Sequence, residues 1–207
     1  MKNYKCTVVF DKDEDGKIFV GGINEIGYLE SDSSGSLEYV SLNEYISNDK
    51  TNYGDVWRII VHQDGLYFQT FSSLFFLESN RNKKTSFLKS LLINHSVQRW
   101  ESRTRFNPIH LIEKRIFVHE RNVGLQELVN GKFKMLPGGE EFAQDLICIM
   151  LPFPSPKINQ NNSSNNILIG SLRRGLFLFD GSKFTKFKNE ADNYLIENRL
   201  YYRGAIL

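Results

Sequence analysis

The sequence predicts an all-β protein: a partial β-propeller of about four four-stranded antiparallel blades and an incomplete fifth. The 207 residues include 16 Phe, 9 Tyr and 2 Trp, and aromatic side chains favour strands over helices. Short apolar stretches recur in a unit of about 50 residues, a period typical of propeller blades. The last repeat is present only in part, so the ring is expected to be unfinished.

The repeat is clearest at the centre of each unit, where an apolar strand, a short polar or glycine-bearing loop and a second apolar strand follow one another. The four centres read KIFVGGINEIGYLES, GLYFQTFSSLFFLES, RIFVHERNVGLQELV and ILIGSLRRGLFLFDG. Another apolar run precedes each centre, and KFKML and KFTKF follow two of them as fourth strands. Asp-Gly pairs in DEDGK and HQDGL suit tight hairpins, so neighbouring strands are expected to be antiparallel.

The whole chain, 1–207, is therefore divided into blade-like repeats. Their approximate ranges are 4–46, 55–101, 107–137 and 146–188, with an incomplete repeat at 194–207. Because a propeller closes by packing its last blade on its first, this half-blade ending suggests a longer natural protein or a truncated reading frame. Open blade edges also predict self-association of the isolated chain.

Two stretches fall outside the repeat. The segment 80–106 is expected to hold an outer strand and a blade connection, with a short helix at KSLLINHSV as the alternative. The segment 152–166, PFPSPKINQNNSSNN, is rich in Pro, Asn and Ser and is expected to form a flexible loop.

Composition limits the partners. The formal net charge of +2 gives no reason to expect nucleic acid, and no apolar run is long enough for a signal peptide or a membrane span. As written, the chain would be cytoplasmic. Cys6 and Cys148 lie in separate apolar strands, which indicates two buried free thiols rather than a disulfide or a zinc site.

The repeated element of strand, Gly-Thr or Gly-Ser, short loop, Gly-Leu, aromatic strand and Asp-Gly resembles the blades of the two-component regulator propeller sensors. These bacterial receptors often carry a triple-tyrosine domain after the propeller. The resemblance rests on GGINEIGYLESDSSGSLEYVSL, DGLYFQT with SLFFLE, NVGLQELVNGKFKMLPGG and ILIGSLRRGLFLFDGSKFTKF. Only the fourth is a close match, since QTFSS and HERNVG depart from the pattern in the second and third repeats.

The resemblance implies a periplasmic propeller that detects a small molecule, often a saccharide. Such a propeller signals to a histidine kinase, cyclase or DNA-binding output domain. No such output domain is recognisable in this sequence, so signalling would depend on further blades or an output domain that this chain lacks.

No chemical motif indicates catalysis, a cofactor or a metal. Asp11–Gly16 (DKDEDG) copies the opening of a calcium loop, but Gly22 stands where the closing bidentate acid should be, so we interpret the segment as a solvated turn. The four histidines have no metal-ligand spacing, and the common nucleophile and nucleotide motifs are missing. We expect a protein that is not an enzyme.

The candidate binding residues lie in the loops between the second and third strands, which should converge on one rim of the disk. A polar rim is what a sugar or acidic ligand requires, although ordinary solvated loops would look the same in sequence. The candidates are Asn24, Glu25, Ser72, Ser73, Arg121, Asn122, Arg173 and Arg174.

The expected function is non-catalytic recognition of a small molecule, such as a saccharide, within a signal-transduction receptor. Three alternatives remain open at this point: a protein-interaction propeller, a remnant of a longer receptor without function, and a propeller lyase or hydrolase acting on a polysaccharide.

Overall fold

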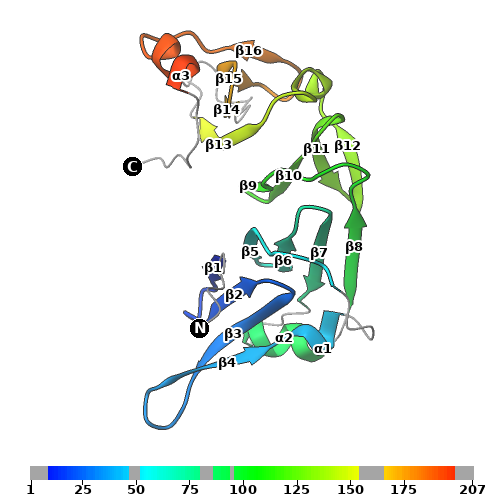
Figure 1. Cartoon of the computed structure of the whole chain (residues 1–207), viewed down its shortest axis with the longest axis vertical. Coiled ribbons are helices and arrows are strands. Elements are labelled where there is room, and N and C mark those ends of the chain that lie inside the picture. The colour runs from blue at the N-terminus through cyan, green and yellow to red at the C-terminus, as the bar shows by residue number, and fades with distance from the viewer. Residues whose placement is uncertain (1–8, 47–51, 80–85, 94–95, 154–165, 199–207) are drawn as a thin grey trace, which may run out of the picture. The chain divides into compact units, whose positions relative to one another are not determined.

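A computed structural model describes residues 9–46, 52–79, 86–93, 96–153 and 166–198 of the chain. The chain divides into two compact units, 1–106 and 107–207. Each unit contains two four-stranded sheets, and in every sheet the strands pair in sequence order (Figure 1). Consecutive antiparallel strands of this kind need only short hairpin connections.

The first unit holds the first two sheets and two short helices. The first sheet consists of β1 (Val9–Lys12), β2 (Ile18–Gly22), β3 (Glu25–Ser31) and β4 (Leu37–Ser41), followed by α1 (Asn43–Ile46). The second consists of β5 (Arg58–His62), β6 (Gly65–Gln69), β7 (Ser73–Glu78) and β8 (Val97–Glu101), with α2 (Phe87–Ile93) between β7 and β8.

The second unit has the same plan. Its first sheet consists of β9 (His110–Ile112), β10 (Arg115–Glu120), β11 (Gly124–Val129) and β12 (Lys132–Met135), followed by the short 3-10 helix η1 (Gly139–Phe142). Its second sheet consists of β13 (Ile147–Phe153), β14 (Asn166–Ser171), β15 (Gly175–Phe179) and β16 (Phe184–Lys186), followed by α3 (Asp192–Asn198).

These four sheets confirm the predicted fold class. The protein is all-β, a partial β-propeller of about four blades, with two blades in each unit. The repeat is visible in individual hydrogen bonds. Trp57 donates its backbone N–H to Gln69 at 2.8 Å, and Asn107 and His119 make the same bond at 2.8 Å one repeat later.

The core of the first unit is aromatic and joins its two blades. Phe68 and Phe75 stack with ring centroids 4.5 Å apart, and Tyr53 packs on Phe75 at 5.6 Å. The ring of Phe87, on α2, meets Phe19 of the first blade edge-on at 5.8 Å. Because all five side chains are buried, the two blades share one hydrophobic core.

The core of the second unit is organised by Phe142, at the end of η1. Its fully buried ring lies 5.3 Å from Phe177 and 4.9 Å from Phe184, both of the fourth blade. The same cluster includes Phe117 and Leu125 of the third blade. The connector between these blades therefore supplies the residue that joins their cores.

At the start of the predicted fifth half-blade, 194–207, the described residues form a helix in place of the expected strand. Residues 194–198 belong to α3, and 199–207 lie outside the described residues. A strand satisfies its backbone only by pairing with a neighbour, whereas a helix forms its own hydrogen bonds. Asn189 also favours the helix, because its Oδ1 accepts the Ala191 N–H at 2.8 Å just before α3 begins.

The region 80–106 contains both structures that the sequence allowed. The helix α2 covers residues 87–93, and the outer strand β8 follows at 97–101. Most of the predicted flexible loop, 154–165, lies outside the described residues, as does Cys6. Cys148 is a free, half-buried thiol, and burial raises its pKa to about 11.

None of the helices in the described part of the chain combines the length and apolar character required to span a membrane.

A buried histidine links the third blade to the connector that follows it. His119 is 0% exposed, with Nε2 2.8 Å from the Phe142 carbonyl oxygen and Nδ1 2.6 Å from the Asn107 side-chain nitrogen. Because a carbonyl can only accept, Nε2 donates and Nδ1 accepts, which requires the neutral imidazole. Burial lowers the pKa of His119 accordingly.

This histidine should make stability depend on pH. The folded pKa lies below the unfolded value of about 6.5, so its contribution is complete above about pH 6.5 and declines as the pH falls. His119→Gln, which introduces the residue found at the corresponding place in the second blade, should flatten the dependence. Urea unfolding of both proteins between about pH 5 and 7.5 tests this, and parallel curves would contradict it.

Candidate functional site

The eight predicted residues lie where the second strand of each blade turns into the third. The first four belong to the first unit and the last four to the second, so the structure places them in two groups. Within each unit, the connector between the blades contacts both turns. We call these two turns, the connector between them and the segment that follows the second blade the rim of the unit.

In the first unit, the connector 54–57 holds the first turn through Asn24. This residue has a left-handed backbone, φ 53°. It donates its backbone N–H to the Gly54 carbonyl at 2.9 Å, and its Oδ1 accepts the Gly54 N–H at 2.6 Å. The side chain is thus used to fix the connector and is not available to a ligand.

Glu25 is occupied in the same way. Its Oε1 accepts the hydroxyls of Tyr39 at 2.8 Å and Ser41 at 2.5 Å, and its Oε2 accepts the Asn43 amide at 3.2 Å. Burial, followed by the bond to Glu25, raises the pKa of Tyr39. Glu25 therefore joins β3 to β4 and the start of α1, which is a structural role.

The second turn contributes one exposed and one buried serine. Ser73 is 0% exposed; its backbone N–H donates to Thr70 Oγ1 at 3.1 Å, and its hydroxyl receives Arg99 at 3.3 Å. Ser72 is exposed, and its hydroxyl has no hydrogen-bond partner among the described residues. Only Ser72 of the four candidates in this unit remains open to a ligand.

The sequence interpretation missed an aromatic group on this rim. The Trp57 ring lies 4.3 Å from the ring of Phe71, and the Arg105 guanidinium lies 3.8 Å from the centroid of the same Phe71 ring. All three residues lie outside the strands, in VWRII, TFSS and RTRF. The sequence did contain one indication of this group: a tryptophan in a blade connector, outside the strands that supply the core.

In the second unit, the connector is η1 with residues 143–146, and it contacts both turns. Asn122, with φ 65°, donates its backbone N–H to the Ala143 carbonyl at 2.8 Å. Its Oδ1 accepts the Gln144 amide at 3.1 Å. Asn122 therefore repeats the role of Asn24, while Arg121 beside it is exposed.

Arg174 is held by both polar and ring contacts. Its guanidinium donates to the Glu141 carbonyl at 3.0 Å and to the Glu141 carboxylate at 3.3 Å. It also lies over the rings of Phe142 and Phe177, at 5.0 and 4.9 Å. This cation links the connector to the fourth blade.

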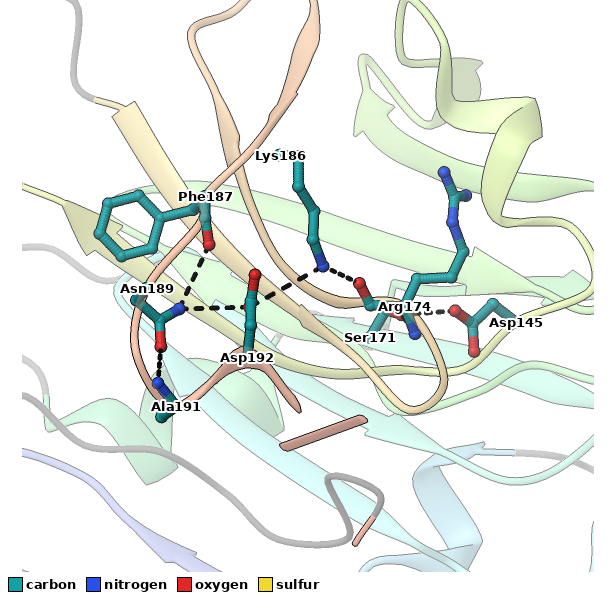
Figure 2. A network of polar contacts seen from close by, with 8 residues as sticks. All are labelled: Asp145, Ser171, Arg174, Lys186, Phe187, Asn189, Ala191 and Asp192. Carbon is teal, nitrogen blue, oxygen red and sulfur yellow. Dashed lines mark hydrogen bonds and ion pairs between the residues drawn. The ribbon is translucent and has the colours of Figure 1, made fainter. Parts of the chain in front are cut away.

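The backbone of the Arg174 turn is fixed from both sides (Figure 2). Ser171 donates its hydroxyl to Asp145 at 2.5 Å and accepts the Arg174 N–H at 2.8 Å. Lys186 donates to the Arg174 carbonyl oxygen and pairs with Asp192 at 3.9 Å. Asn189 donates to Asp192 at 3.3 Å, so the network extends to the start of α3.

Arg173 differs from its neighbour. Its side chain is exposed and makes no ion pair or hydrogen bond within the described part of the chain. The exposed polar candidates are therefore Ser72 in the first unit, and Arg121 and Arg173 in the second. The other five mainly hold the rims together.

Arg174→Ala should lower the free energy of unfolding by about 1 kcal/mol, because it removes two ring contacts and a half-exposed pair with Glu141. Arg173→Ala is the matched control and should change stability by less than about 0.5 kcal/mol. Urea denaturation of the two variants measures the difference. Equal losses would show that the contacts of Arg174 do not contribute.

No metal site is formed by the described residues: no three His, Cys, Asp or Glu side chains are grouped to hold an ion. In the calcium-like segment, Asp11 accepts the backbone N–H groups of Lys12 and Val61 at 2.9 Å, and Asp15 accepts that of Phe87 at 3.5 Å. Asp13 is only 7% exposed, so this turn is less solvated than predicted. The Asp11 and Asp15 carboxylates therefore accept hydrogen bonds from the backbone.

No protein-family model matches the chain, and no curated protein matches it.

Proposed function

We propose that this protein is a ligand-sensing propeller fragment of a bacterial signal-transduction receptor, which binds a small molecule such as a saccharide without catalysis. The blade motifs that resemble two-component regulator propellers support this proposal, as does the fold of about four four-stranded blades. A periplasmic location, further blades and an output domain belong to the same proposal.

One observation carries the proposal: the rims present exposed polar side chains on a backbone that is held in place. The Ser72 carbonyl accepts the Ser102 N–H at 2.8 Å, and Leu172, next to Arg173, donates to Leu146 at 2.9 Å. A binding residue on a fixed loop loses less conformational entropy when a ligand arrives. Ser72, Arg121 and Arg173 lie on loops of this kind, so ligand binding should cost them less conformational entropy than it would cost residues on freely solvated loops.

Calorimetric titration of the full chain with a panel of oligosaccharides tests the proposal. We expect a saccharide that binds and is recovered intact, with weaker binding after Ser72→Ala, Arg121→Ala or Arg173→Ala. Lys183→Ala is the control, because this exposed lysine lies in the turn between β15 and β16, at the other end of β15. A shortened saccharide would indicate a hydrolase or lyase instead.

A protein-binding propeller is the second candidate, and the edge strand β4 favours it. Leu37 and Tyr39 on this strand are 60% and 44% exposed, and an open apolar strand edge pairs readily with another chain. This function would give concentration-dependent self-association in sedimentation velocity, reduced by Leu37→Lys. A monomer at all concentrations would leave the ligand-binding proposal as the better one.

A further inference from the structure

The strongest unassigned feature is the stack of Trp57, Phe71 and Arg105 on the rim of the first unit. Trp57 lies in the connector, Phe71 in the turn between β6 and β7, and Arg105 in the segment after β8. Three separate parts of the chain thus bring two aromatic rings and a cation together. We call this group the aromatic stack.

Backbone hydrogen bonds hold each part of the aromatic stack. Trp57 donates its N–H to the Gln69 carbonyl, and Phe106, next to Arg105, donates to the Phe71 carbonyl, both at 2.8 Å. The two rings are 4.3 Å apart and inclined at 45°. The arrangement is therefore formed before any ligand binds, which reduces the entropic cost of binding.

The aromatic stack has unused binding capacity. The Trp57 side chain is exposed, with the residue at 38%. Within the described part of the chain, neither its indole N–H nor the Arg105 guanidinium has a hydrogen-bond acceptor or a carboxylate partner. Glu101 does not neutralise Arg105, because it pairs with Arg99 at 2.9 Å. An exposed indole and a cation without a carboxylate partner among the described residues therefore both contact the Phe71 ring.

We propose that the aromatic stack binds an acidic saccharide, with the apolar C–H face of a sugar ring on Trp57 and a uronate carboxylate on Arg105. An amphipathic aromatic ring offers an apolar face to such a ligand, and a guanidinium matches a carboxylate in bidentate geometry. The Ser72 hydroxyl, next to Phe71 in the chain, adds a further polar group. This inference rests on the proposed function and names its ligand class.

The chain offers a direct spectroscopic test, because it contains only two tryptophans. In a Trp100→Phe background, Trp57 is the sole indole and reports on its own site. Titration with a trigalacturonate should change its fluorescence saturably, whereas the neutral maltotriose should bind at least about tenfold more weakly. Raising the salt concentration should weaken the acidic ligand more than the neutral one.

The variants separate the roles of the ring and the charge. By calorimetry, Trp57→Ala and Arg105→Gln should each weaken trigalacturonate binding at least about tenfold. Trp57→Phe keeps an aromatic ring at this position and replaces the alanine variant in the comparison if that variant is unstable. Arg103→Gln removes a charge from the same segment and should have little effect. A thermal melt of each variant confirms that it is folded.

The outcomes distinguish this inference from the proposed function. Binding that survives Trp57→Ala but is lost in Arg173→Ala would overturn the aromatic-stack assignment and leave a saccharide sensor. Equal binding of maltotriose and trigalacturonate, unaffected by Arg105→Gln, would overturn the acidic ligand class. If no saccharide of the panel binds the full chain, both proposals fail.

Discussion

Phe68→Ala is expected to lower the free energy of unfolding of the first unit by roughly 3–5 kcal/mol. Phe68 is 0% exposed, stacks on Phe75 at 4.5 Å and contacts Tyr53 at 5.9 Å. Removing the ring loses its transfer energy and leaves a cavity among other large rings that cannot all move inward. A loss of this size approaches the whole stability of a small domain.

Urea denaturation followed by far-ultraviolet circular dichroism measures this effect. Phe10→Ala is the matched control, because the same side chain on β1 is 75% exposed and its loss should cost less than about 0.5 kcal/mol. Similar unfolding midpoints for the two variants would show that the aromatic core does not hold the first two blades together.

Gly124→Ala is expected to lower the free energy of unfolding of the second unit by roughly 2–4 kcal/mol. Gly124 opens β11 with φ +126°, a conformation that residues with a Cβ rarely adopt. A Cβ there would overlap the carbonyl oxygen of Gly139 and lie 2.9 Å from the Cα of Glu140. Both atoms belong to the backbone of η1, so relief would require the connector to move.

The effect should extend beyond stability, because η1 carries Glu141 and Phe142, the partners of Arg174 and His119. Gly22→Ala is the control, since a Cβ at this position meets nothing within 4 Å and its φ is not in the left-handed region. Thermal melts of the two variants provide the comparison. A Gly124 variant as stable as the Gly22 variant would mean that the contact with η1 is not tight.

The strands and their order were predictable because their determinants are local. Runs such as KIFVGG and LYFQT have the apolar and aromatic content of buried strands, and Asp-Gly pairs mark the turns. The period near 50 residues then assigns four strands to each blade. The same local logic placed the eight candidate residues where second strands meet third strands: six lie in the turns, and Glu25 and Ser73 are the first residues of β3 and β7.

Local sequence patterns gave the wrong prediction where the same residues suit more than one local structure. NYLIEN has enough apolar content for a strand, yet residues 192–198 form α3, because the helix meets its own hydrogen-bond requirement and Asn189 supports its start. Similarly, the Asp-rich segment DKDEDG looks like a solvated turn, but Asp13 is buried and Asp11 accepts the N–H of Val61 from the next blade.

The sequence by itself therefore determined the all-β class, the four-stranded repeat and the positions of the turns, since strand and turn preferences depend on neighbouring residues. Only the tertiary structure decided which turn residues are available. Arg173 and Arg174 are adjacent and chemically identical, but Arg174 is held by Glu141 and two rings while Arg173 is exposed. Trp57, Phe71 and Arg105 meet for the same reason: contacts between segments that are distant in the sequence arise only when the blade folds.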